Sequence, residues 1–318
     1  MGPRFRGDDR TGKTVTVKTA VPINDAPDGP GWRCVWPAGC ELGEGPIWDA
    51  LTGVVRFVDI KGAAVHRLDP VSGVRASWAA PTMIGGLGLR AGSGLVAGTR
   101  LGFALVDPDA GSFEVIDHPE AHLPGNRFND GKVDPHGNFW AGTMDDARRE
   151  RSGALYCLRP DRTWRAVDLG YRITNGPAFS PDGRTLYHSD TSDQTTFTFD
   201  LAPDGTLANK RVFRTWHDVR GFPDGMTTDA DGCLWLAFWG GWCVRRVSPA
   251  GDLLAEMPLP VSNVSSVAFG GVGLDRLFAT SAWSDLQAAA RTAQPLAGGL
   301  FEVLGHGVTG LPGGVWPG

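Results

Sequence analysis

Turn signals recur through most of the chain at a nearly constant interval. Six short segments combine Asp, Ser, Pro or small residues with a glycine, as tight turns between strands do, and these glycines follow one another at intervals of 41 to 49 residues. A second series lies between them, so each interval holds two hairpins. The glycines of the first series are Gly53, Gly94, Gly137, Gly183, Gly232 and Gly273. The second series is at Gly73, Gly111, Asp161, Gly205, Gly251 and, as an expected sixth member, Gly305–Gly307.

Two hairpins in each of six repeats predict an all-β protein, a six-bladed β-propeller with a central channel. The runs VVRFVDI, NFWAGTM and CLWLAFW each follow a first-series turn and are rich in β-branched or aromatic residues. The 45 glycines and 12 tryptophans also fit many short strands joined by turns. A sandwich of two sheets is the alternative, but it would not require a constant interval.

Charge and composition narrow the class of ligand. The net charge of −5 gives no basic surface for nucleic acid or anionic membrane. No apolar run reaches the roughly 18 residues of a membrane span, and the N-terminal residues lack a signal-peptide core, so we expect a cytoplasmic protein. The five cysteines contain no C-x-x-C pair, which favours reduced thiols. The expected partner is a small molecule, and the chain a monomer or weak homo-oligomer.

The first 30 residues differ from the repeats. They are polar and contain proline, so residues 1–30 are predicted to form a flexible leader and residues 31–318 the propeller domain. The segment GDDRTGKT at 7–14 has the spelling of a phosphate-binding loop, which requires a preceding strand and a following helix. The sequence TVTVKT that follows alternates as a strand does, so we interpret the match as chance.

One position of the repeat is rich in oxygen donors. Innermost strands of a propeller converge on the channel, so equivalent residues can meet there. Carboxylate and amide oxygens are ligands for Ca²⁺, Mg²⁺ or Mn²⁺. The competing interpretation is that Asx-Gly and Glu-Gly pairs only begin turns. Counting back eight residues from each first-series glycine, and nine in the first repeat, gives Glu44, Gly86, Asn129, Asn175, Asp224 and Ser265.

Several motifs around these positions are those of a known family. LGEGPIWD (42–49), RFNDGKVDPHGNFWAGTM (127–144), TNGPAFSPDGRTLYHSD (174–190) and PDGMTTDADGCLW (223–235) resemble the SMP-30/gluconolactonase/regucalcin family. The resemblance extends from about Trp36 to Phe301 and leaves out the leader. It implies a propeller that binds one divalent cation, with Ca²⁺ as the first expectation and Mn²⁺, Zn²⁺, Mg²⁺ or Fe²⁺ as alternatives.

The resemblance also assigns roles to individual residues. It implies Glu44, Asn175 and Asp224 as metal ligands and Arg127 and Asn129 as substrate-binding residues. The family's acidic contact after the GTM motif is carried over in part, to Asp146. Each of these residues is named for its match to a family motif. The three metal ligands also occupy the oxygen-rich repeat position.

The implied reaction is hydrolysis of a sugar lactone, such as gluconolactone, xylonolactone or arabinonolactone, to its aldonic acid. Our hypothesis makes Asp224 the catalytic base for the attacking water; activation of the water by the metal is the alternative. A related metal-dependent esterase or organophosphatase and a non-catalytic calcium-binding propeller are the other functions considered. A serine esterase is disfavoured because no G-x-S-x-G motif occurs. Trp235, Trp239 and Trp242 are expected in the blade core rather than in a sugar-binding wall.

Overall fold

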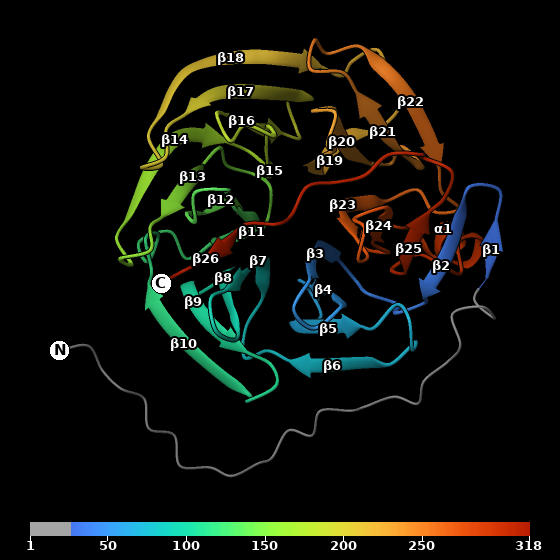
Figure 1. Ribbon diagram of the computed structural model, residues 1–318, viewed down its shortest axis with the longest axis horizontal. Helices are drawn as coiled ribbons and strands as arrows, with labels where there is room; N and C mark the ends of the chain where they lie inside the picture. Colours follow the sequence, from blue (N-terminus) through green and yellow to red (C-terminus); the bar gives the residue numbers. More distant parts are fainter. Residues whose placement is uncertain (1–26) are drawn as a thin grey trace.

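The computed structural model describes residues 27–318, and these form a ring of six sheets around a central channel (Figure 1). The GDDRTGKT segment and nearly all of the predicted leader lie outside the described residues. The predicted all-β propeller with six blades is confirmed. Every first-series turn joins the two innermost strands of a blade.

Each of the first five blades is built from consecutive antiparallel strands, beginning at the channel. Blade 1 contains β3 (Gly43–Asp49), β4 (Val54–Asp59), β5 (Ala64–Leu68) and β6 (Arg75–Ala79). Blade 2 contains β7 (Ile84–Arg90), β8 (Leu95–Thr99), β9 (Gly102–Asp107) and β10 (Ser112–Asp117). Blade 3 contains β11 (Asn126–Val133), β12 (Phe139–Asp145), β13 (Gly153–Leu158) and β14 (Trp164–Tyr171). Blade 4 contains β15 (Thr174–Phe179), β16 (Thr185–Asp190), β17 (Thr195–Leu201) and β18 (Leu207–Thr215). Blade 5 contains β19 (Phe222–Thr228), β20 (Leu234–Trp239), β21 (Cys243–Val247) and β22 (Leu253–Pro258).

Blade 6 combines strands from the start of the described chain with the strands that follow blade 5. Its strands β23 (Val264–Gly270), β24 (Arg276–Ser281) and β25 (Leu300–Val303) pair with β2 (Trp32–Trp36), which in turn pairs with β1 (Asp28–Gly29). The sixth second-series hairpin predicted at Gly305–Gly307 is therefore wrong, because β2 supplies the fourth strand. This pairing closes the ring, because the segment that precedes blade 1 supplies the outer strands of blade 6. It also places β1 inside the range assigned to the leader.

The C-terminal segment after β25 crosses one end of the channel. It ends in β26 (Val315–Trp316), which pairs in parallel with β7 of blade 2 (Figure 1). Trp316 is fully buried, and a side chain at Gly314 would have its Cβ 2.3 Å from the carbonyl oxygen of Asp134. The innermost strands finish at this end, so the segment covers the channel opposite the ends where those strands begin.

The core lies between neighbouring blades and contains most of the large side chains. Trp140 and Trp235 are both buried, and each donates its indole N–H to an aspartate six residues earlier, Asp134 and Asp229 respectively, at 2.8 and 2.9 Å. Each aspartate also accepts backbone N–H groups of its own turn. The same device thus fixes the first-series turn and the core tryptophan of two blades.

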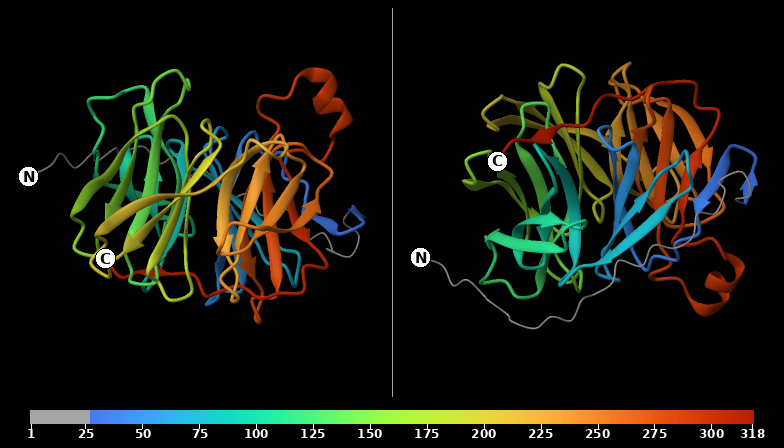
Figure 2. Two further views of the ribbon diagram at one scale, coloured as in Figure 1. Left: turned by 90° about the horizontal axis from the view of Figure 1, so that it is seen from above. Right: turned by 60° about the horizontal axis from the view of Figure 1, so that its bottom comes forward.

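Helix is almost absent from the described residues. The six-residue α1 (Ala288–Ala293) lies in the connection between β24 and β25, on the face opposite the C-terminal segment (Figure 2). Within residues 27–318 no helix has the length and apolar character that a membrane crossing needs. The five cysteines are all buried and free, as expected for reduced thiols.

His188 in β16 should make the stability of the fold depend on pH. It is fully buried against Tyr171, and within the described residues neither ring nitrogen has a hydrogen-bond partner. Burial lowers the pKa of His188 to about 3. An unfolded histidine takes up its proton near pH 6.5, so stability should fall as the pH drops below about 6.5. At pH 5 the free energy of unfolding should therefore fall by about 2 kcal/mol less in His188→Phe than in wild type. Urea unfolding between pH 5 and pH 7.5 measures this difference.

The exposed His122 provides the matched control. His122→Gln should keep the wild-type dependence on pH. Parallel losses of stability in wild type and His188→Phe would show that His188 is not the group responsible.

Candidate metal centre and substrate pocket

Each innermost strand has an irregularity in its pairing at the same place. The register shifts between Glu44 and Ile47 in β3, and between Asn175 and Ala178 in β15. Comparable shifts interrupt β7, β11, β19 and β23. Such bulges change the direction of a side chain relative to a regular strand. The residues found by counting back from the turns are therefore structurally equivalent, and they lie where the innermost strands begin.

Two of the six equivalent positions do not contribute to the site. Gly86 lies so close to blade 3 that an added Cβ would be 2.3 Å from the backbone nitrogen of Gly131. Ser265 is fully buried and hydrogen-bonds to the carbonyl oxygen of Gly43 and to Thr280. The remaining four positions supply two carboxylates and two amides.

A cavity of about 380 Å³ opens at this end of the channel. Its volume is in the range of small-molecule sites and would hold a monosaccharide. The residues that line it come from strands of four blades (1, 3, 4 and 5) and from connections between strands, including the one after β24 of blade 6. All six residues predicted for the site line this cavity, namely Glu44, Arg127, Asn129, Asp146, Asn175 and Asp224.

The base of the cavity concentrates negative charge. Burial raises the pKa of Glu44 well above its usual range, and the charges of Asp224 and Asp130 raise it further. Burial and the charge of Asp130 likewise raise the pKa of Asp224. Buried carboxylates that repel one another are stable as anions only beside a compensating cation. This oxygen-rich set fits a hard divalent ion, since neither a thiol nor an imidazole lines the cavity.

The orientation of Asn175 is fixed by its neighbours. Its amide nitrogen donates to Thr191 Oγ1 at 2.7 Å, and Thr191 Oγ1 donates to the carbonyl oxygen of Pro223 at the same distance. Asn175 Oδ1 accepts one hydrogen bond, from Asn129 Nδ2 at 3.0 Å. An amide oxygen has two lone pairs, so Oδ1 retains one for a cation. No pattern in the sequence indicated Thr191, which lies outside the repeat position.

Arg127 is held in one orientation by three acceptors. Its Nε donates to Asp146 Oδ1 at 2.6 Å, and its Nη1 donates to Asn129 Oδ1 at 2.8 Å and to the carbonyl oxygen of Phe128 at 3.0 Å. Lys61 Nζ also donates to Asp146 Oδ1, at 2.6 Å. Burial opposes ionisation of Asp146, but the hydrogen bonds from Lys61 and Arg127 lower its pKa below the usual value. Asp146 is therefore an anion that positions Arg127.

Some lining residues were not predicted. Trp239 is half-buried: it packs against the core cluster that includes Leu42 and Ala282, as expected, and it also lines the cavity, which was not expected. Trp235 is in the core, and Trp242 lies under the guanidinium of Arg220, 5.8 Å from the ring centre. A tryptophan face of this kind suits the apolar face of a sugar ring. The repeat pattern cannot distinguish these positions, because Trp239 ends β20 where the strand leaves the core.

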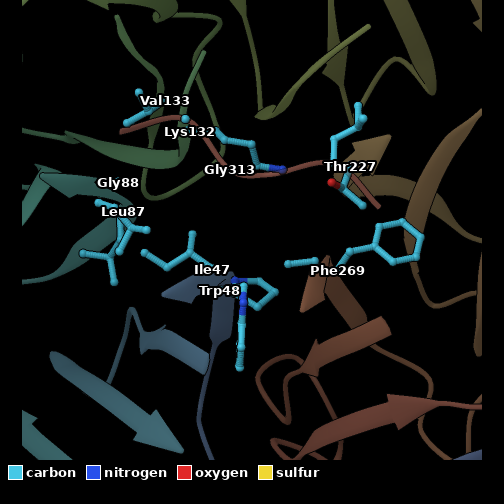
Figure 3. Close-up of a pocket in the computed structure, with 14 residues that line it drawn as sticks. Ile47, Trp48, Leu87, Gly88, Lys132, Val133, Thr227, Phe269 and Gly313 are labelled. Carbon is cyan, nitrogen blue, oxygen red and sulfur yellow. The ribbon is translucent and has the colours of Figure 1, made fainter. Parts of the chain in front are cut away.

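The opposite end of the channel holds a smaller pocket of about 70 Å³ (Figure 3). Its ring of labelled residues is mainly apolar, and the C-terminal segment crosses it at Gly313. The one charged side chain that lines it, Lys132, donates to the carbonyl oxygen of Met226 at 2.6 Å. This pocket is too small for a sugar and has no carboxylate, so the larger cavity is the candidate site.

A second group of metal-ligating residues occurs in blade 1. Donor atoms of Cys40, Asp59 and His66 lie within 4.8 Å of one another. The carboxylate of Asp59 accepts the backbone N–H groups of Glu41, Leu42 and Gly62, and burial raises the pKa of the Cys40 thiol. Asp59 therefore stabilises the loops on either side of it, and a protonated thiol is a poor metal ligand.

The chain is similar to characterised proteins over most of its length. 6-Deoxy-6-sulfogluconolactonase of Pseudomonas putida is 36% identical, over 85% of this chain and 93% of its own. Regucalcin of Xenopus laevis is 34% identical, over 88% of this chain and 96% of its own. A crystal structure of regucalcin from Agrobacterium tumefaciens, described as a calcium-binding protein, superposes with a TM-score of 0.86 at 30% identity. That alignment covers 90% of this chain and 97% of the other.

A family model described as the SMP-30/Gluconolactonase/LRE-like region matches residues 42–283, which run from just before Glu44 to the connection that follows β24. The match includes all four oxygen-donor positions. It also includes the two bulged innermost strands that carry the carboxylates, β3 with Glu44 and β19 with Asp224. Fold, site geometry and sequence thus agree, and the chain belongs to the SMP-30/gluconolactonase/LRE-like family.

Proposed function

We propose that this protein is a hydrolase that opens the cyclic ester of a sugar lactone to give the aldonic acid, using one divalent cation. The observation that carries the proposal is the convergence of Glu44, Asn175 and Asp224 with Arg127 and Asn129 around one sugar-sized cavity. The similarity to 6-deoxy-6-sulfogluconolactonase supports a lactone-hydrolysing enzyme. The regucalcin structure from Agrobacterium tumefaciens, described as a calcium-binding protein, supports a cation site.

The residues divide between holding the cation, moving a proton and binding the sugar. Glu44, Asn175 and Asp224 would hold the cation, which when bound polarises the lactone carbonyl. Burial and the charge of Asp130 raise the pKa of Asp224 in the metal-free site, and a bound cation would lower it again. Asp224 is assigned as the base because its carboxylate lines the cavity beside the position proposed for the cation, where it could take a proton from the attacking water. Arg127 and Asn129 would bind sugar hydroxyl groups, with Asp146 keeping Arg127 in place.

The finer assignments follow from the donor set and the relatives. Oxygen ligands favour Ca²⁺, with Mn²⁺, Zn²⁺, Mg²⁺ and Fe²⁺ as the other ions to test. Gluconolactone, xylonolactone and arabinonolactone are the first substrates to examine. The five free, buried thiols support a cytoplasmic location.

A pH-indicator assay tests the proposed reaction. Purified protein with each cation in turn should open at least one of the three lactones about 100-fold or more faster than protein-free buffer. General acid–base catalysis alone gives an acceleration of about this size. Aryl esters and phosphotriesters in parallel wells test the esterase and organophosphatase alternatives. Turnover of these alone would replace the lactonase proposal.

A non-catalytic calcium-binding role is the second candidate, and the likeness to the calcium-binding regucalcin of Agrobacterium tumefaciens favours it. Saturable Ca²⁺ binding by folded protein that hydrolyses none of the lactones or esters would support it. Lactone opening at the rate above would exclude it as the sole function.

A further inference from the structure

The cavity has an excess of basic side chains away from its base. Glu44 and Asp224 lie at the base and are assigned to the cation. Two other carboxylates line the cavity, Asp146 and Asp285, and they face four basic side chains. The chain as a whole carries a net charge of −5, so this local excess has the opposite sign. The basic residues that line the cavity are Lys61, Arg127, Arg148 and Arg172.

Three of these four basic residues have a carboxylate partner. Lys61 and Arg127 share Asp146. Arg148 pairs with Asp285 through contacts of 2.6 and 3.0 Å. These partners keep the side chains in place and neutralise part of their charge.

Arg172 differs from the other three. It lies between β14 and β15, three residues before the predicted ligand Asn175. Its Nη1 donates to the carbonyl oxygens of Arg148 and Arg149, at 3.3 and 3.0 Å. Among residues 27–318, no carboxylate lies within 4.0 Å of its guanidinium. Arg172 is thus half-buried and positioned by main-chain acceptors, and its nearest acidic influence is the charge of Asp193, which lies beyond ion-pair distance.

The neighbourhood of Arg172 extends this positive region across the mouth. Arg148, whose carbonyl oxygen accepts from Arg172, lies in the loop after β12, and its partner Asp285 lies in the connection after β24. Both ends of this ion pair are about half exposed. Both residues also have left-handed backbone conformations, with φ of 59° and 64°. A negatively charged group entering here would meet Arg172 directly and Arg148 beside it.

We propose that the substrate is a sugar lactone with an anionic group at the end remote from the lactone carbonyl, and that Arg172 binds this group. The inference rests on the proposed function, which places the carbonyl at the cation and so directs the far end of the sugar toward the mouth. Phosphate, sulfonate and carboxylate each present at least two acceptor oxygens on one atom, and a guanidinium can bind such a pair with two parallel hydrogen bonds. Arg172 is accordingly a specificity-determining residue.

The test compares glucono-1,5-lactone with derivatives that carry phosphate, sulfonate or carboxylate at carbon 6. Wild type should have a kcat/KM for at least one anionic lactone about tenfold or more above that for the neutral lactone. Arg172→Gln should lower this ratio about tenfold or more, mainly through KM, and Arg172→Lys should restore part of it. Arg184→Gln, which changes an exposed arginine that does not line the cavity, is the matched control and should keep the wild-type ratio.

The outcomes separate this inference from the proposed function. If wild type opens lactones but Arg172→Gln leaves the ratio unchanged, or lowers both activities in parallel, the anion-binding role is wrong and the lactonase proposal stands. If wild type opens no lactone, the proposed function fails, and thermal unfolding with glucose or glucose 6-phosphate decides the role of Arg172. Stabilisation by glucose 6-phosphate that Arg172→Gln removes would support anion binding there; equal effects of both sugars would overturn it.

Discussion

Asp224→Asn is expected to lower lactone turnover by about 10³-fold or more, because it removes both a cation ligand and the proposed base. The substitution keeps the shape of the side chain, so the pocket should remain packed. It also removes a buried negative charge from the neighbourhood of Asp130 and Glu44. The measurement is kcat/KM for the best lactone, with circular dichroism to confirm the fold.

Although Asp224→Asn should lower turnover, it should raise the stability of the metal-free protein. Burial and the charge of Asp130 raise the pKa of Asp224, so metal-free wild type loses stability as the pH rises above about 4, the ordinary pKa of an aspartate. Asp224→Asn lacks this loss and should melt at a higher temperature than metal-free wild type at pH 7. Asp231→Asn, an exposed residue in the first turn of the same blade, is the control and should match wild type in both assays. Undiminished turnover in Asp224→Asn would refute the assignment.

Adding a bound divalent cation to metal-free protein is expected to raise the melting temperature by about 5 °C or more. A ligand at 100 times its Kd stabilises the folded state by about 2.7 kcal/mol, and a domain of this size gains roughly 2 °C for each kcal/mol. The physical reason is the relief of repulsion between Glu44 and Asp224. Differential scanning fluorimetry across the series of cations measures the shift and ranks the ions.

Glu44→Gln provides the comparison for this experiment. It should melt at or above the temperature of metal-free wild type and respond much less to the cation. The carboxylate of Asp59, in the Cys40 and His66 group, accepts three backbone N–H groups and is not expected to bind the ion. A cation shift of wild-type size in Glu44→Gln would move the metal centre away from the channel.

Much of this architecture could be predicted from the sequence because turn chemistry is local. Gly53 and the five glycines that follow it at a nearly constant interval mark real hairpins, and their spacing identifies Glu44, Asn175 and Asp224 as equivalent. The sixth outer turn at Gly305–Gly307 was wrong because closure of the ring depends on a strand from the other end of the chain. No local pattern reports that pairing.

The walls of the pocket were harder to predict than its base. Thr191, Trp239 and Arg172 lie at strand ends or in connections, outside the repeat position, so counting from the turns cannot find them. Their roles depend on which loops meet over the channel. Arg172, for instance, is positioned by carbonyl oxygens from a loop of the preceding blade. Such contacts become visible only when the blades are assembled.

The most direct test of the metal-dependent lactonase is a cation titration of activity. Protein stripped with chelator is assayed on the best lactone while Ca²⁺, Mn²⁺, Zn²⁺, Mg²⁺ or Fe²⁺ is added in steps. A metal-dependent lactonase should show almost no turnover before addition and a saturable recovery that is complete at one bound cation per chain. Full activity in the stripped protein, with its metal content verified as zero, would contradict it.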